Sequence, residues 1–119
     1  MIIINLTQHD STLTQKEQGV VEPKDKQVIK TLLTFNAIPT VAEMSERAEK
    51  LANLAYESGA PAAMVGGAPY FMSALEQALK AKGVKPLYAF SERKSVDKHL
   101  PDSTVTKVAV FEHVGFVEV

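Results

Sequence analysis

The segment of residues 62–70 is the part of the sequence that most restricts the fold. It reads Ala-Ala-Met-Val-Gly-Gly-Ala-Pro-Tyr, an apolar run that stops at two glycines and resumes behind a proline. This pattern predicts a buried strand, a glycine turn and a helix that begins near Pro69. Such a turn directs backbone N–H groups and the positive end of a helix dipole at one point, which suits an anionic group. Because the segment matches neither the dinucleotide fingerprint nor the P-loop, it predicts a site without naming its ligand.

Two further apolar runs predict strands that join this one in a parallel sheet. Residues 1–6 are Met, Ile and Leu interrupted only by Asn5, as expected of a strand buried on both faces, and we expect this strand at the centre of the sheet. Residues 87–90 predict a third strand, which follows a helix over residues 69–82. Crossover connections through helices therefore predict parallel strands.

Capping signals predict the helices of the first crossover. Thr14 and Glu17 are spaced as a capping box for a short helix, which Gly19 ends. Asp25 can cap a second helix over residues 26–35, whose apolar side chains recur at helical spacing.

The longest predicted helix begins after Thr40 and ends near residues 58–59. Thr40 and Glu43 are spaced as a second capping box, and apolar residues recur every three or four positions behind it. Two i,i+4 ion pairs are expected on its polar side, Glu43 with Arg47 and Glu46 with Lys50. The pattern predicts a helix lying on a sheet, with a coiled-coil interface as the alternative.

The last third of the sequence changes to extended segments. Pro101 and Asp102 are a turn signal, and residues 104–111 predict a β-hairpin that adds antiparallel strands at one sheet edge. Gly115 allows a bend or bulge in the final segment. We therefore predict a single α/β domain over residues 1–119. Its fold is expected to be Rossmann-like, with a mainly parallel sheet flanked by helices and an antiparallel C-terminal hairpin.

Composition excludes several classes of function. The chain has 119 residues, with 13 basic and 14 acidic side chains and no basic stripe, which argues against duplex nucleic acid as a partner. It has no cysteine, so disulfides and thiolate chemistry are excluded. The first apolar run is too short for a membrane span and lacks the basic flank of a signal peptide. We expect a cytoplasmic protein without a membrane partner.

The candidate site follows from the predicted sheet. Ligands of open parallel sheets bind beyond the carboxyl ends of the strands, and the segments after the three predicted strands meet at that edge. We expect His9 to move a proton and Arg93 to bind phosphate or carboxylate, as the catalytic residues of an enzyme. The expected ligand-binding residues follow the same three strands: Thr7, Gln8, Gly66, Gly67, Tyr70, Ser91 and Ser95.

Each candidate also has a purely structural interpretation. The two glycines can serve tight strand-to-helix packing alone, Arg93 can be a solvated charge beside acidic neighbours, and Tyr70 can pack on the sheet. His9 can be a surface or capping residue. The sequence names no cofactor. A metal site is not predicted, because the groups available for one lack ligand spacing: His9, Asp10, His99 and His113.

Several motifs carry a resemblance to a known family. They are Ile-Asn-Leu-Thr-Gln-His at residues 4–9, Met-Val-Gly-Gly-Ala-Pro at residues 64–69 and Tyr-Ala-Phe-Ser-Glu-Arg at residues 88–93, with Val-Gly-Phe at residues 114–116. On these motifs the chain resembles a small, uncharacterised bacterial family of stand-alone Rossmann-like proteins, which implies no activity. In size and architecture alone it is similar to small CRISPR-associated proteins that bind or cut cyclic oligonucleotide messengers.

Two hypotheses of function follow. The first is a cytoplasmic protein that binds an anionic, nucleotide-like molecule at the carboxyl edge of the sheet, with phosphodiester or transfer chemistry if it is an enzyme. The alternative is a non-enzymatic interaction protein whose crevice is vestigial. A homodimer is expected under both, because the C-terminal segment carries apolar residues that a small domain cannot cover: Val108, Val110, Val114, Phe116 and Val119.

Overall fold

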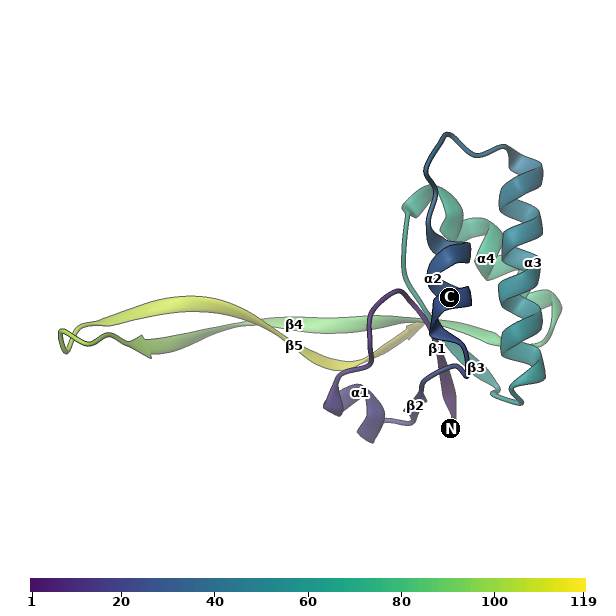
Figure 1. Cartoon of the computed structure of the whole chain (residues 1–119). Coiled ribbons are helices and arrows are strands. Elements are labelled where there is room, and N and C mark those ends of the chain that lie inside the picture. The colour runs from purple at the N-terminus through teal and green to yellow at the C-terminus, as the bar shows by residue number, and fades with distance from the viewer.

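The computed structural model describes all 119 residues, which form a mixed α/β fold around one five-stranded sheet (Figure 1). Its strands are β1 (Ile3–Leu6), β2 (Val20–Val21), β3 (Ala62–Val65), β4 (Lys85–His99) and β5 (Val105–Glu118). The order across the sheet is β2-β1-β3-β4-β5, with β5 antiparallel to β4 and every other pair parallel. The predicted parallel sheet with an antiparallel C-terminal hairpin is confirmed.

The position of β1 differs from the prediction. β1 pairs with a strand on each side, but β3 holds the middle of the sheet. The reason is β2, a strand of two residues directly after Gly19, which pairs Val20 with Ile3 and Val21 with Ile4. A segment this short shows no periodicity, so the sequence did not predict it.

Helices α2 (Lys26–Leu33), α3 (Val41–Glu57) and α4 (Pro69–Ala81) begin where their signals predict. The Asp25 carboxylate accepts hydrogen bonds from the first turn of α2, and the Thr40 hydroxyl accepts one from the Glu43 N–H. Both predicted ion pairs of α3 form, Glu43 with Arg47 at 2.9 Å and Glu46 with Lys50 at 3.2 Å.

Helix α1 (Leu13–Glu17) begins two residues before the predicted start. Its capping box consists of Thr12 and Gln15, which exchange hydrogen bonds in both directions, and not of Thr14 and Glu17. Glutamine serves as well as glutamate at the third helical position, and the two boxes overlap in sequence.

The core lies on one face of the sheet. Helices α2, α3 and α4 pack there against β1 and β3, and Phe71, Leu51 and Leu75 are among the side chains that this packing buries fully. The opposite face holds a smaller cluster drawn from strands alone: Ile3, Val20, Ala62, Met64 and Leu87. None of the helices has the length and apolar character needed to cross a membrane.

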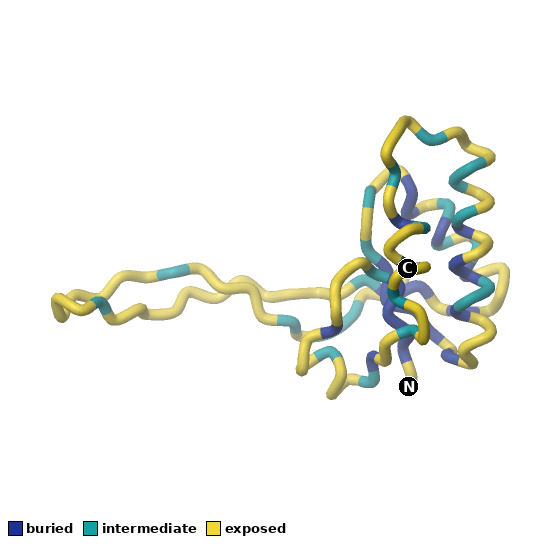
Figure 2. Tube along the Cα trace, viewed as in Figure 1, coloured by how far each residue is buried: buried dark blue, intermediate teal, exposed yellow.

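Strands β4 and β5 extend beyond the sheet as a two-stranded ribbon (Figures 1 and 2). We call residues 91–112 the arm. It makes the molecule 57 Å long, against 35 and 25 Å in the other directions, and every residue from Ser91 to His99 is exposed. The predicted turn lies at the arm's end, where the Leu100 N–H donates to the Thr104 carbonyl at 2.9 Å.

The expectation that a loop follows the third strand at Ser91 is wrong, because β4 continues to His99. Residues 91–99 carry polar side chains on both faces, since both faces meet solvent. The alternation of apolar and polar residues that marks a half-buried strand is therefore absent there.

The arm is held to the body by contacts at its root. Phe90 pairs with Gly115 and Ser91 with His113, which leaves Val114 as the extra residue of a bulge, as the glycine predicts. The Gln18 amide donates to the Val114 carbonyl at 3.3 Å, and its oxygen lies 2.7 Å from Nε2 of His113. Burial lowers the pKa of His113.

Candidate functional site

A polar pocket of about 320 Å³ lies at the carboxyl ends of β1 and β3. The chain turns from β1 to β2 on one side and from β3 to β4 on the other, so this is where the strand order reverses. Such a point is the preferred ligand position in open α/β sheets. The pocket is lined by Thr7, Gln8, His9, Asp10, Thr12, Gln15, Met64, Val65, Gly66, Gly67 and Ala89.

The pocket brings together the predicted residues of two loops. Thr7, Gln8 and His9 after β1 face the same space as Gly66 and Gly67 after β3. The third segment is not among its lining residues, because β4 runs on into the arm; the residues of that segment with predicted roles are Ser91, Arg93 and Ser95.

Tyr70 lies in a different hollow. Its ring meets Phe35 edge to face at 5.7 Å, in an open pocket of about 580 Å³. Most of that lining is hydrophobic, and it comes from the loop between α2 and α3: Phe35, Asn36, Ala37, Ile38 and Pro39, with Met44 and Tyr70. A specific site needs several polar groups that converge on the ligand. We therefore place the candidate site at the smaller pocket.

The glycine turn leaves the start of α4 open beside the pocket. Ala68 is the N-cap and makes no side-chain hydrogen bond to the first turn. Pro69 has no N–H, and the Phe71 N–H donates to the Ala68 carbonyl at 2.9 Å, so the glycine N–H groups are the donors nearest the pocket. Gly67 has φ +156°, and a Cβ there would lie 3.3 Å from the Met72 side chain, so the turn approaches the helix closely.

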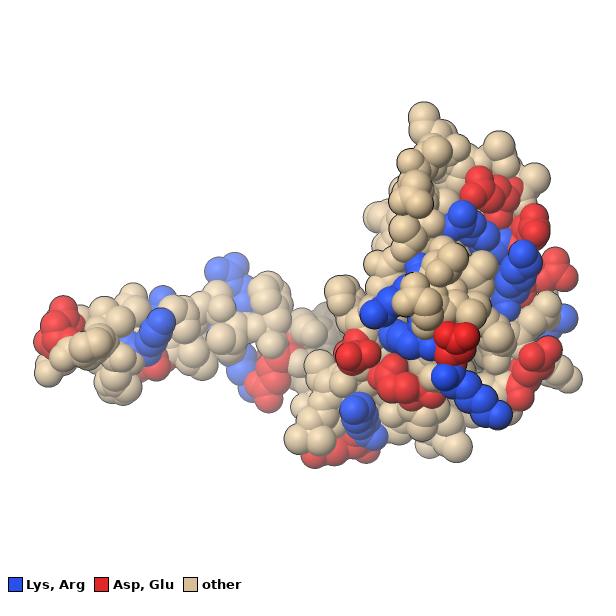
Figure 3. Space-filling view, in the orientation of Figure 1, with Lys and Arg blue, Asp and Glu red and all other residues tan.

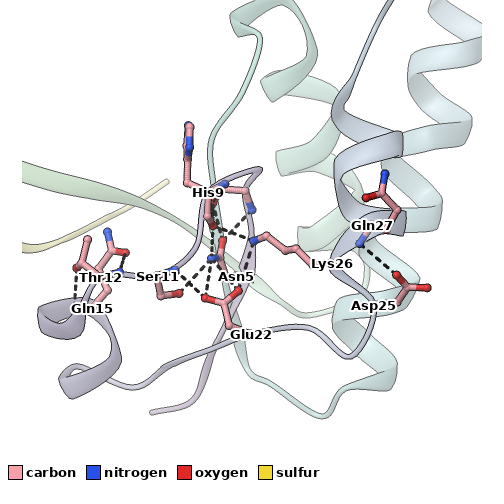
Figure 4. Close-up of polar contacts among 10 residues, drawn as sticks. Asn5, His9, Ser11, Thr12, Gln15, Glu22, Asp25, Lys26 and Gln27 are labelled. Carbon is pink, nitrogen blue, oxygen red and sulfur yellow. Dashed lines mark hydrogen bonds and ion pairs between the residues drawn. The ribbon is translucent and has the colours of Figure 1, made fainter.

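Beneath the pocket, Asn5 is the centre of a hydrogen-bond network (Figure 4). Its side chain is fully buried although it belongs to β1. The Asn5 amide nitrogen lies 2.8 Å from the His9 carbonyl oxygen and 3.1 Å from Ser11 Oγ, and its oxygen accepts from both N and Oγ1 of Thr7. A buried amide with partners on both its nitrogen and its oxygen fixes the loop that follows the strand.

Glu22 and Lys26 complete the network. Oε1 of Glu22 accepts from the Ser11 N–H at 2.7 Å, and Nζ of Lys26 donates to the His9 carbonyl at 2.9 Å. Burial alone would raise the pKa of Glu22, but hydrogen bonds from Ser11 and Asn5 and the charge of Lys26 outweigh it and lower this pKa to about 2. The carboxylate is therefore ionised at neutral pH, and in this form it holds the loop.

The network positions His9 by its backbone and leaves its side chain free. Asn5 and Lys26 both donate to the His9 carbonyl, while the imidazole points away from them (Figure 4). The ring is exposed and takes part in none of the hydrogen bonds of the structure. It is thus available to a ligand in the pocket.

The sequence pattern assigns no role to Ser11, Glu22 or Lys26, and it places Asn5 in the first predicted strand without a role. One signal was present: Asn5 is an amide within a run of isoleucine and leucine, and a polar residue in a fully buried strand must have partners. Glu22 has one local partner, Lys26 four residues later, but its two other partners lie 11 and 17 residues earlier in the chain, where no local pattern reveals them.

The depressed pKa of Glu22 predicts an acid-dependent stability. A carboxyl group whose pKa falls from 4.5 to about 2 on folding stabilises the fold above pH 4.5, and this stabilisation is lost as the pH falls toward 2. Since the side chain is one-third exposed, we expect about 1–2 kcal/mol after allowance for solvent screening. Glu22→Gln should be less stable at pH 7 and should lose less stability between pH 5 and 2. Urea unfolding across this range measures both; parallel curves for the two proteins would contradict the assignment.

The three histidines of the chain lie far apart in the fold. His9 lines the pocket, His113 lies at the root of the arm and His99 ends β4. No group of three or more His, Cys, Asp or Glu side chains is placed to hold a metal ion.

Fold and site together define an α/β protein with a polar pocket at the carboxyl edge of its parallel strands and a projecting antiparallel arm. The chain belongs to the Uncharacterized protein MJ1673 family, whose model matches residues 1–117. Among curated proteins and solved structures, none matches it.

Proposed function

We propose that the protein binds a small anionic, nucleotide-like molecule in the pocket between the β1 and β3 loops. The observation that carries this proposal is the convergence of the Gly66–Gly67 turn and the Thr7–His9 loop on one pocket. The backbone N–H groups of a glycine turn that leads into a helix favour phosphate or carboxylate, and the hydroxyl of Thr7 suits sugar or phosphate oxygens.

The size of the pocket limits the ligand. At about 320 Å³ it is at the lower end of the range for small-molecule sites, which suits a mononucleotide or a part of a larger molecule. A Rossmann-like fold is part of the same proposal, supported by the reversal of strand order at the pocket.

Phosphodiester or transfer chemistry in this pocket would depend on His9. Its unbonded imidazole can accept or donate a proton near neutral pH, and the glycine N–H groups can hold a developing oxyanion. Arg93 of the same chain does not line the pocket, so the charge stabilisation expected of it has no counterpart within one copy.

Thermal unfolding with adenosine monophosphate or inorganic phosphate tests the binding proposal. A ligand that binds only the folded protein, present at one hundred times its Kd, adds about 2.7 kcal/mol to the free energy of unfolding. The midpoint of thermal unfolding should therefore rise by several degrees. Gly66 allows a matched pair of variants, because a Cβ there would only touch Thr7, at 3.5 Å. Gly66→Asp should abolish the rise by charge repulsion, whereas the isosteric Gly66→Asn should keep most of it. A wild-type midpoint that no anion shifts at millimolar concentration would refute the proposal.

A second candidate function is that of an interaction protein, and the arm favours it. Isolated two-stranded ribbons are marginally stable in water, yet here one projects with Phe111 75% and Val105 51% exposed. A surface of this kind fits a protein partner.

A further inference from the structure

Strand β4 has an open edge where β3 ends. β3 pairs with β4 only from Lys85 to Tyr88, and the last pair is Val65 with Tyr88. From Ala89 to His99 the same edge of β4 has no neighbouring strand. The outer edge of β5 is open along the arm as well, and Gln18, the C-cap of α1, contacts its backbone only at Val114, at the root. An open edge of this length is a template for another strand.

The charges of the arm favour a second copy as the partner. The arm carries four acidic and four basic residues, and Figure 3 shows both signs along its length. A surface without net charge does not select nucleic acid or an acidic membrane. The acidic members are Glu92, Asp97, Asp102 and Glu112, and the basic members are Arg93, Lys94, Lys98 and Lys107.

The charges along β4 are complementary to themselves when the β4 strands of two copies pair antiparallel with Ser95 opposite Ser95. In that register Glu92 faces Lys98 of the second copy, and Arg93 faces its Asp97. By symmetry each contact occurs twice, so four ion pairs form. None of these four side chains takes part in an ion pair within the chain. The one ion pair on the arm joins Lys94 to Glu112.

Neighbouring registers place like charges opposite each other. A shift by one residue sets Glu92 against Asp97, or Arg93 against Lys98. A shift by two sets Lys94 against itself or against Lys98. Like charges directly opposite destabilise a strand pair, so the sequence selects the register centred on Ser95.

The same register improves the arm itself. Within one chain Glu92 lies opposite Glu112, a repulsion that Lys98 of the second copy would relieve. Lys94 pairs with Val110 across the hairpin, and Val96 pairs with Val108. Because Lys94 of one copy meets Val96 of the other, each such row across the four-stranded ribbon holds three valines and one lysine, in the order Val108, Val96, Lys94 and Val110.

The pairing also brings the end of each arm to the pocket of the other copy. The added β4 strand lies in line with β3, and the added β5 strand lies in line with β1, so the arm's end points at the carboxyl ends of β1 and β3. His99 of the second copy falls opposite Ser91, two residues from Ala89 on the same face, and Ala89 lines the pocket. No lysine or arginine lines the pocket within one copy.

We propose that two copies of the chain pair through the open edges of β4, antiparallel and centred on Ser95, and that each copy supplies His99 to the other's pocket. The proposed pairing rests only on the open edge of β4, its charges and the register that they select. The sharing of His99 rests on the proposed function of the pocket.

A single introduced thiol tests the pairing directly. The chain has no cysteine, and Ser95 faces itself in this register, with Cα atoms about 4.5–5.5 Å apart, within the reach of a disulfide. Ser95→Cys should form a covalent dimer under mild oxidation. Ser91→Cys, on the same edge and facing His99 of the second copy, should not. A Ser95→Cys protein that stays monomeric, or equal crosslinking of the two variants, would overturn the pairing.

Charge exchange tests the register without crosslinking. Arg93→Asp puts a carboxylate opposite Asp97, and Asp97→Arg puts two guanidinium groups face to face. Each variant alone should have the monomer mass by light scattering at micromolar concentration, and a mixture of the two should form a dimer. Lys24→Asp, an exposed reversal in the body, should leave the wild-type dimer intact. A monomeric wild type, single variants that still dimerise, or a mixture that does not pair would overturn the proposal.

Phosphate binding separates the shared site from the pairing. His99→Ala should keep the dimer mass and weaken inorganic phosphate binding by about tenfold. Thr106→Ala, on the opposite face near the arm's end, should change neither. Equal phosphate affinity of His99→Ala and wild type would remove the shared site and leave the proposed function standing. Absence of phosphate binding to the wild type would remove both, while the mass measurements still decide the pairing.

Discussion

Asn5→Ala should lower the free energy of unfolding by about 3 kcal/mol, because it removes a fully buried amide and takes a hydrogen-bond partner from several surrounding groups. Each orphaned donor or acceptor costs about 1–3 kcal/mol, and the loss of side-chain volume adds to this. The groups that lose a partner lie on three segments: Thr7 N, the His9 carbonyl, Ser11 Oγ and the Glu22 carboxylate. Urea unfolding at pH 7 measures the change.

Asn36→Ala is the matched control, since Asn36 is exposed in the loop between α2 and α3 and its loss should cost less than about 0.5 kcal/mol. The network account also predicts that Asn5→Ala flattens the pH dependence that Glu22 produces, because one donor to the carboxylate is gone. An Asn5→Ala protein as stable as the control would show that the network does not hold the loop.

Phe71→Ala should cost about 3–5 kcal/mol, the range for truncation of a buried aromatic side chain. Phe71 is 1% exposed in the first turn of α4, and its ring lies 5.2 Å from that of Phe35. The cavity would lie in the first turn of α4, which follows the glycine turn directly. We therefore expect loss of anion binding together with loss of stability, measured by thermal unfolding with and without phosphate.

Tyr70→Ala is the control for this prediction. Tyr70 is the preceding residue and meets the same Phe35 ring, but it is 56% exposed. Its truncation should cost about 1 kcal/mol or less and should leave phosphate binding unchanged, since it lies outside the candidate pocket. Similar losses for the two variants would contradict the distinction between the core face of α4 and the open apolar hollow.

The sequence predicted those parts of the fold that local signals encode. Asp25 and Thr40 were predictable as helix caps, because a short polar side chain directly before an amphipathic run can accept hydrogen bonds from the first-turn N–H groups. The strand, glycine turn and helix of residues 62–81 follow equally from pattern and proline position. The two-residue β2 and the continuation of β4 could not be found this way, because neither shows the alternation of a half-buried strand.

The candidate site was predictable only where chain direction alone determines it. Parallel strands bring Thr7 and Gly66 to one edge whatever the side chains do, and the pocket contains both. The placement of Arg93 depended on where β4 ends, which the tertiary structure decides; it lies exposed on the arm. The role of Glu22 was not predicted, because it depends mainly on contacts with Asn5 and Ser11, which lie far earlier in the sequence.

The central claim is that the pocket between the β1 and β3 loops binds an anionic, nucleotide-like molecule. Titration of ¹⁵N-labelled protein with adenosine monophosphate, followed by amide chemical shifts, tests it most directly. The account predicts saturable shifts at Gly66, Gly67 and the residues from Thr7 to Asp10, and little change around Ile38 and Tyr70 in the apolar hollow. Saturable shifts confined to that hollow, or no saturable shift at the two glycines, would contradict it.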